Sequence, residues 1–125
     1  MGRSILLVGI GGLIGSILRY LASVFFAEHV NSPFPYATLI VNIVGCFLIG
    51  LLFAVSDRWE VLSPEWRILL TTGFCGGFTT FSTFSYESVR LMQDGEMLFA
   101  FANVAVSVIA GFAATWLAIV LVRSI

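Results

Sequence analysis

The segment from Gly73 to Ser85, GFCGGFTTFSTFS, is unusual for an apolar stretch. It holds three glycines, five hydroxyl side chains and four phenylalanines in 13 residues. Adjacent glycines followed by β-branched threonines disfavour a continuous helix, so we expect a break between Gly76 and Thr80. A break at membrane depth frees backbone groups that protein, water or an ion must satisfy. Converging carbonyls would suit a cation such as Na⁺, and freed amides would suit an anion.

Two phenylalanines of this segment, Phe81 and Phe84, are three residues apart and should share one helix face. The ordinary role of such rings is packing against lipid or core. An aromatic ring also has a positive edge, and edges that point into a narrow pore would favour a small anion without a full charge. The sequence leaves both interpretations open.

Polar residues inside the other apolar stretches are further candidates. Asn42 lies in the middle of the second stretch. Its amide needs a partner there, so it either forms a hydrogen bond to another helix or binds a permeating species. Asn103, Ser107, Gly111 and Thr115 follow at intervals of four, which places them on one face of a helix. A serine or threonine can bond its own backbone instead, but four small or polar positions on one face favour a polar stripe.

The first stretch contains one charge and two small-residue motifs. Arg19 either extends to the membrane surface or has a structural or pore-mouth role. Gly11-x-x-x-Gly15 and Gly12-x-x-x-Ser16 allow another helix to approach closely. That helix belongs either to the same chain or to a second copy, and the sequence favours neither.

The residues that proton pumping, catalysis and metal binding require are missing from these apolar stretches. No Asp, Glu, Lys or His lies in the middle of an apolar stretch: Glu87 lies at the end of the third, and His29 lies in a loop. A proton-driven pump usually needs a buried ionisable group, and an enzyme needs a nucleophile with its base. One histidine and two distant cysteines, expected to be free thiols, are too few for a metal cluster. We therefore expect a passive pathway and no enzyme.

The elements that must position these residues are membrane helices. Hydrophobic residues make up 59% of the 125 residues and charged residues 10%, and the mean hydropathy is +1.04. Soluble domains are about 45–50% apolar and about 25% charged. This composition excludes a soluble enzyme and a disordered chain. A net charge of −1 without any lysine also excludes nucleic-acid binding.

Four apolar stretches, at residues 4–27, 33–56, 68–86 and 97–122, are long enough to cross a hydrocarbon core about 30 Å thick. They lack the alternation of a barrel strand, so we predict four transmembrane helices in one domain, residues 1–125. Ser63-Pro64 is typical of a helix start before the third stretch. Arginines divide four to two between the two sides of the membrane, a weak bias that permits insertion in either orientation and an antiparallel dimer.

Three motifs together resemble one family over nearly the whole chain. They are Gly12-x-x-Gly15-x-x-x-Arg19-Tyr20, Thr38-Leu39-x-Val41-Asn42-x-x-Gly45 and the segment from Gly73 to Ser85. In these the chain resembles the Fluc (CrcB) fluoride channels of bacteria. The third motif is highly specific, and the other two are moderately so.

The resemblance implies an all-α protein of the bacterial inner membrane. Its subunits would have four transmembrane helices with a broken third helix and would form an antiparallel, dual-topology homodimer. Two pores per dimer would export cytoplasmic fluoride passively and so confer fluoride resistance. A structural Na⁺ at the dimer interface would be held by the backbone carbonyls of Gly76 and Thr79.

The resemblance also implies roles for particular residues. Arg19 and Glu87 would lie at the pore vestibule or support it. Three positions depart from the family: Ala37 stands where glycine is common, Gly111 stands where serine is common, which removes one hydroxyl, and Asn103 has no assigned role. The implied fluoride pathway consists of Asn42, Phe81, Ser82, Thr83, Phe84, Ser107 and Thr115.

Two other functions fit a short apolar chain less well. A dual-topology, proton-coupled exporter like the small multidrug resistance proteins needs a carboxylate in its first helix, and this first stretch has none. An accessory subunit of a larger membrane complex would explain the lack of soluble parts. It would not explain the polar stripe or the glycine-rich third stretch.

Overall fold

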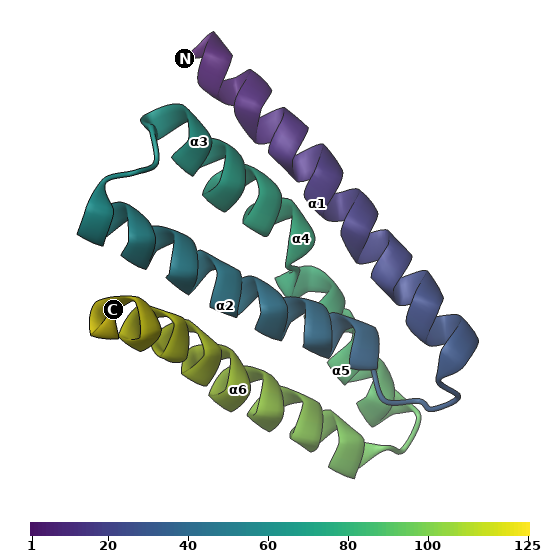
Figure 1. Ribbon diagram of the computed structural model, residues 1–125. Coiled ribbons are helices and arrows are strands. Elements are labelled where there is room, and N and C mark those ends of the chain that lie inside the picture. Colours follow the sequence, from purple (N-terminus) through teal and green to yellow (C-terminus); the bar gives the residue numbers. More distant parts are fainter.

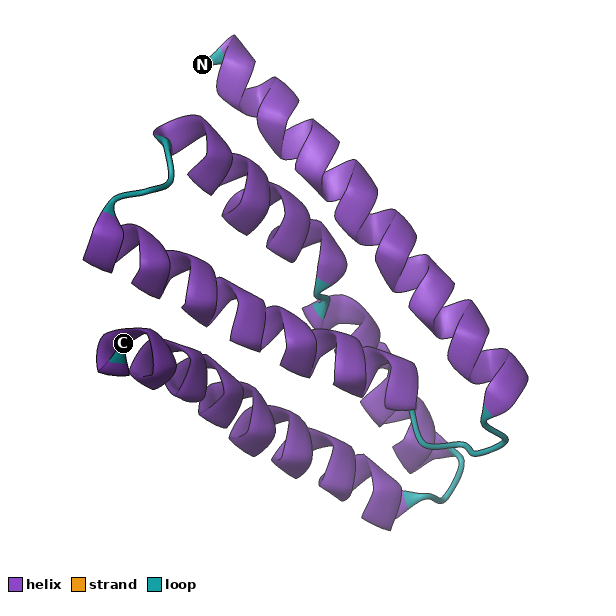
Figure 2. Ribbon diagram, viewed as in Figure 1, coloured by secondary structure: helices purple, strands orange, loops and turns teal.

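The computed structural model describes residues 1–125, and its regular structure is entirely helical (Figure 2). Three helices are long and apolar enough to cross a membrane, which confirms the prediction of a multi-pass membrane protein. They cover the first, second and fourth predicted stretches. These helices are α1 (Gly2–His29), α2 (Tyr36–Trp59) and α6 (Met97–Ser124).

The third stretch forms a series of short helical pieces from Pro64 to Gln93, here called the broken span. The chain runs through α3 (Pro64–Ile68), a wider π-helical segment η1 (Leu69–Cys75) and α4 (Gly76–Phe78). Helix α5 (Phe81–Gln93) follows after two extended residues. The expected break is thus confirmed, and it lies at the C-terminal end of the predicted interval.

The start of α3 follows the expected capping pattern. Ser63 is the N-cap residue, its hydroxyl accepts a hydrogen bond from the Trp66 amide at 3.3 Å, and Pro64 follows it in the first turn. The preceding helix α2 ends at Trp59, and its C-cap residue Glu60 has a φ of 52°, which turns the chain out of the helix. These two local signals define the connection between α2 and the broken span.

The helices lie side by side as a bundle (Figure 1). Both termini and the α2–α3 connection lie at one end, and the α1–α2 and α5–α6 connections lie at the other. Helix α1 packs mainly on η1 and α4, and α2 packs mainly on α6. The first half of the broken span therefore lies between α1 and α2, where it is held from both sides (Figure 1).

Glycines allow α1 and the broken span to touch backbone to backbone. A Cβ on Gly11 would overlap the Leu69 carbonyl, and a Cβ on Gly15 would overlap the Phe74 carbonyl. A Cβ on Gly77 would lie 2.6 Å from the Gly12 carbonyl oxygen. The small-residue motifs of the first stretch thus serve packing within the chain, which is one of the two interpretations that the sequence leaves open.

A second seam of small residues joins α2 to α6. A Cβ on Gly50 would lie 2.7 Å from the Thr115 carbonyl oxygen and 3.2 Å from the Ala118 Cβ. Ala118 and Val122 are almost fully buried in this seam. Dispersion contacts at such short range hold helices together in lipid, where the hydrophobic effect contributes little. Helices α2 and α6 therefore pack closely against each other along this seam.

Candidate functional site

The site is built around the break in the third span. Thr79 (φ −87°, ψ 160°) and Thr80 (φ −152°, ψ 126°) are both extended, so the helical hydrogen bonds stop between α4 and α5. Thr80 is also the N-cap of α5, and its hydroxyl accepts a hydrogen bond from the Thr83 amide at 3.2 Å. Thr80 thus ends the break and starts the next helix.

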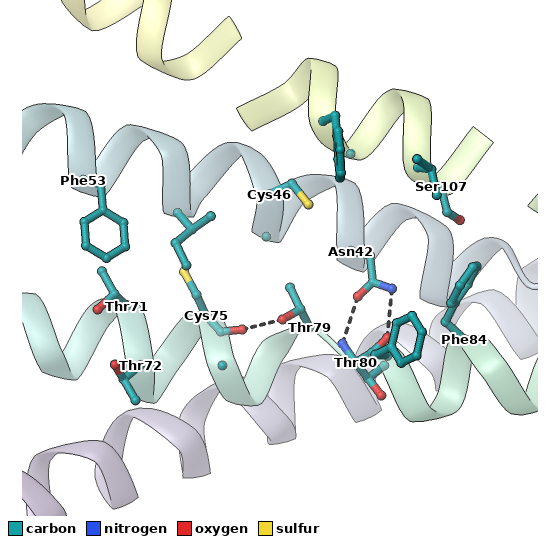
Figure 3. A pocket seen from close by; sticks show the side chains of 17 residues that line it. Asn42, Cys46, Phe53, Thr71, Thr72, Cys75, Thr79, Thr80, Phe84 and Ser107 are labelled. Atoms are coloured by element: carbon teal, nitrogen blue, oxygen red, sulfur yellow. Dashed lines mark hydrogen bonds between the residues drawn. The ribbon is translucent and has the colours of Figure 1, made fainter. Parts of the chain in front are cut away.

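The side chain of Asn42 on α2 forms two hydrogen bonds to the backbone of this break, which together are called the clamp (Figure 3). Its amide nitrogen donates to the Thr80 carbonyl at 3.0 Å, and its amide oxygen accepts from the Thr80 amide at 2.9 Å. This pair of bonds replaces the helical partners that Thr80 has lost. Only one N–H of Asn42 remains free for any other partner.

The carbonyls around the break divide into two groups. Cys75 accepts from both the amide and the hydroxyl of Thr79, at 3.0 and 2.8 Å, and Gly77 accepts from Arg19 Nε at 3.1 Å. No side chain and no backbone amide of the break bonds to the carbonyls of Gly76 and Thr79. These two residues are the ones expected to hold a cation. Uncharged carbonyl oxygens are hard ligands of the kind that Na⁺ accepts.

A pocket with a volume of about 580 Å³ opens beside the break. Residues of α2, η1, α4, α5 and α6 line it, and none of them carries a charge. Its wall is mostly apolar, and a few polar groups are set into it. The polar side chains that line it are Asn42, Thr71, Thr72, Thr79, Thr80 and Ser107, together with the thiols of Cys46 and Cys75.

Phe81 and Phe84 lie at one end of this pocket. Their ring centroids are 5.7 Å apart and the rings are tilted by 51°, so the two side chains form a pair on one face of α5, as expected. The Phe81 side chain is 79% exposed in the single chain.

The expected polar stripe of α6 divides among three environments. Ser107 and Gly111 line the pocket. The Thr115 hydroxyl instead donates to the Cys46 carbonyl at 2.9 Å, so it joins α6 to α2. Asn103 is 1% exposed and lies outside the pocket, against α5. The sequence places these residues on one face but does not indicate which partner each one meets.

A second, smaller pocket of about 160 Å³ also borders the break. Arg19 and Glu87 both line it, together with Thr38, Thr80 and Thr83. They form no salt bridge there, and the Oε1 atom of Glu87 is buried without a hydrogen-bond partner. Thr80 lines both pockets, so both of them border the break.

The structure thus brings most of the predicted residues to these two pockets. Ser82 remains exposed, with its hydroxyl 3.4 Å from that of Thr80. Both cysteines are free thiols, as expected. Thr80, which bonds to Asn42 and borders both pockets, was not among the predicted site residues. Its place at the end of the Gly-Gly-Phe-Thr-Thr run is the signal that could have identified it.

Comparison with known proteins gives the family. Residues 6–119 match the model of a family described as CrcB-like protein, Camphor Resistance (CrcB). A protein of Leptospira interrogans called Fluoride-specific ion channel FluC is 44% identical over 119 residues, which are 92% of this chain and 94% of that protein. Proteins with the same name from Flavobacterium psychrophilum and Geotalea daltonii are 41% and 47% identical, each over 98% of this chain and 99% of the relative.

Proposed function

The chain belongs to the CrcB-like family, and from that premise we propose that it is a passive, fluoride-selective channel of a cell membrane. The name shared by its relatives supports fluoride as the conducted ion. The observation that carries the proposal is the clamped break, which keeps polar backbone and hydroxyl groups beside an uncharged pocket at membrane depth. The protein is a channel and not an enzyme.

Fluoride is small, hard and strongly hydrated, so a pathway must offer donors that replace its water. Hydroxyl and amide groups can do this at the break and at Ser107. The edges of Phe81 and Phe84 add weak positive potential without a buried charge that would trap the ion. A negative-inside voltage drives fluoride outward by about 2.3 kcal/mol per 100 mV. No coupling to protons or nucleotides is required.

The proposed pathway runs from the larger pocket past the break into the smaller one. Phe81, Phe84, Asn42 and Ser107 border its first part, and Thr83 borders its second part. Ser82 and Thr115 lie beside this route. In the smaller pocket the Arg19 guanidinium would attract the anion, and the Glu87 carboxylate would favour its release.

The proposed assembly is an antiparallel, dual-topology homodimer of four-span subunits with two pores. The larger pocket opens on the surface of the single chain, beside the exposed rings of Phe81 and Phe112. A second copy placed there would cover these rings and close the pocket into a pore. The weak division of arginines is compatible with insertion in both orientations.

The same arrangement fits a structural Na⁺ between the subunits. One chain offers the free carbonyls of Gly76 and Thr79, which are two ligands. Two chains would offer four, close to the number of hard oxygen ligands that such a cation needs. When bound, Na⁺ would neutralise four carbonyl dipoles and fix the breaks of the two subunits relative to each other.

The test is anion efflux from liposomes that contain the purified protein. We expect fast fluoride efflux with little chloride efflux, and we expect it to depend on a potassium ionophore, because a channel moves net charge. Efflux that is driven by a proton gradient and independent of the ionophore would show coupled exchange. Absence of fluoride efflux from well-folded protein would contradict the proposal.

A further inference from the structure

A buried chain of hydrogen bonds connects α6 to α5 behind the larger pocket. Asn103 is 1% exposed, and its amide nitrogen donates to the Ser88 hydroxyl at 3.0 Å. The Ser88 hydroxyl donates to the Phe84 carbonyl at 2.9 Å. At the other end, the Ser107 oxygen lies 3.4 Å from the amide oxygen of Asn103. Only Ser107 among these polar side chains lines the pocket.

The number of protons on each group determines which group donates and which accepts in this series of hydrogen bonds. Ser88 has a single hydroxyl proton, and the Phe84 carbonyl, which can only accept, takes it. Ser88 can therefore only accept from Asn103, so the amide must turn its nitrogen to Ser88 and its oxygen to Ser107. It follows that Ser107 is the donor in the last bond of the chain.

This direction determines what Ser107 presents to the pocket. A serine hydroxyl has one proton, and while that proton points to Asn103 the oxygen lone pairs face the other way. Lone pairs repel an anion. The separation of 3.4 Å is long for an O–H···O bond, for which about 2.7–2.8 Å is typical, so the proton is held weakly. An arriving anion can draw it into the pocket, but this leaves a buried amide oxygen without a donor.

We propose that Asn103 is a positioning residue that sets how strongly Ser107 binds a permeating anion, by competing for its only proton. The inference rests on the proposed fluoride conduction. Asn103 touches neither the pocket nor the ion and acts through Ser107. The competition weakens the anion site and thereby speeds release of the ion.

Two variants remove the competition in different ways. Asn103→Leu keeps a similar volume but has no acceptor for the Ser107 proton. Ser88→Ala lies outside both pockets and removes the anchor that orients the amide, so the Asn103 nitrogen can turn to Ser107 instead. In both variants Ser107 would direct its proton to the pocket. Ser88→Ala keeps the idea testable if Asn103→Leu does not fold.

The measurement is the initial rate of fluoride efflux from liposomes as a function of fluoride concentration. We expect either variant to lower the half-saturating concentration by about threefold or more. The maximal rate should fall as well, because a more tightly held ion leaves more slowly. Ser124→Ala is the control, because that hydroxyl is exposed, bonds its own helix at Leu121 and should leave both quantities unchanged.

A double-mutant cycle with Ser107→Ala decides the mechanism. The effect of either variant should vanish in the Ser107→Ala background, because the residue through which Asn103 acts is gone. An effect of equal size in that background would show that Asn103 only packs α5 on α6, and would overturn the inference. So would an unchanged half-saturating concentration in both single variants. Failure of the proposed function would appear as a wild-type protein that conducts no fluoride. Failure of the inference would appear only in the variants, with normal conduction by the wild type.

Discussion

Asn42 is the residue on which the broken span depends most directly. Its two bonds to Thr80 supply partners to one partly buried amide and one partly buried carbonyl at the break. A buried polar group left without a partner costs about 1–3 kcal/mol. The same side chain lines the larger pocket. The two interpretations of Asn42 from the sequence, interhelical bond and ion contact, are therefore compatible, because one N–H remains free.

Replacement of Asn42 by alanine should reduce fluoride efflux by about tenfold or more, because it leaves both groups of Thr80 unpaired and shifts the break. The measurement is fluoride efflux from liposomes with a fluoride electrode. Asn31→Ala, in the exposed α1–α2 loop, is the control and should conduct like the wild type. Wild-type efflux from Asn42→Ala would contradict the role of the clamp.

Phe81 allows the role of the aromatic edge to be separated from stability. Its ring is 79% exposed in the single chain, so Phe81→Ile removes little packing within the subunit. We expect a large loss of fluoride efflux with an unchanged unfolding temperature, because an aliphatic side chain has no positive edge. Phe101→Ile on α6, 74% exposed and outside both pockets, is the matched control. Equal efflux from both variants would assign Phe81 to simple packing.

At the scale of elements, the contact of α1 with the broken span is the most sensitive to added volume. Gly15→Ala should destabilise the protein by about 1–3 kcal/mol or more, because its Cβ would overlap the Phe74 carbonyl. Gly9→Ala is the control on the same helix: it has no atom within 4 Å and gains helix propensity. Thermal unfolding in detergent measures both. A Gly15→Ala protein as stable as Gly9→Ala would show that α1 can move away from the span without cost.

The sequence predicted those features that depend on a few neighbouring residues. The Gly76-Gly77 pair before Thr79 and Thr80 located the break, and Ser63-Pro64 located the start of α3. The π-helical turn of η1 was not predicted, because seven residues are too few to distinguish it from an α-helix by periodicity.

Long-range partners could not be read from the sequence. Thr80 matters because it meets Asn42, which lies 38 residues earlier. Thr115 was predicted to belong to the ion path, and no local motif indicated that its hydroxyl would bond to the Cys46 carbonyl, 69 residues away. Both outcomes depend on how closely α2 approaches its neighbours. That distance is set by packing of small residues and not by any single motif.

At the scale of the whole molecule, one chain provides only part of the proposed channel. The larger pocket is open on one side, and two carbonyls, of Gly76 and Thr79, are too few to hold a cation. A second copy would supply both the missing wall and the missing ligands. The proposed Na⁺ site therefore depends on the proposed assembly, because one chain alone does not offer enough ligands.

Removal of Na⁺ should lower fluoride efflux and weaken the dimer, because four carbonyl dipoles would then face one another without a cation between them. The protein is purified and reconstituted in buffers containing either Na⁺ or N-methyl-D-glucamine at equal ionic strength. Efflux is measured by electrode, and the dimer by chemical cross-linking. Unchanged efflux and an unchanged dimer without Na⁺ would contradict the carbonyl site but leave fluoride conduction intact.

The most direct test of selective, passive fluoride conduction is current through a planar bilayer that holds the reconstituted protein between unequal fluoride concentrations. The reversal potential should follow the equilibrium potential of fluoride, and it should stay there when chloride or pH is changed on one side. A reversal potential that follows chloride or the proton gradient, or the absence of current from folded protein, would contradict the account.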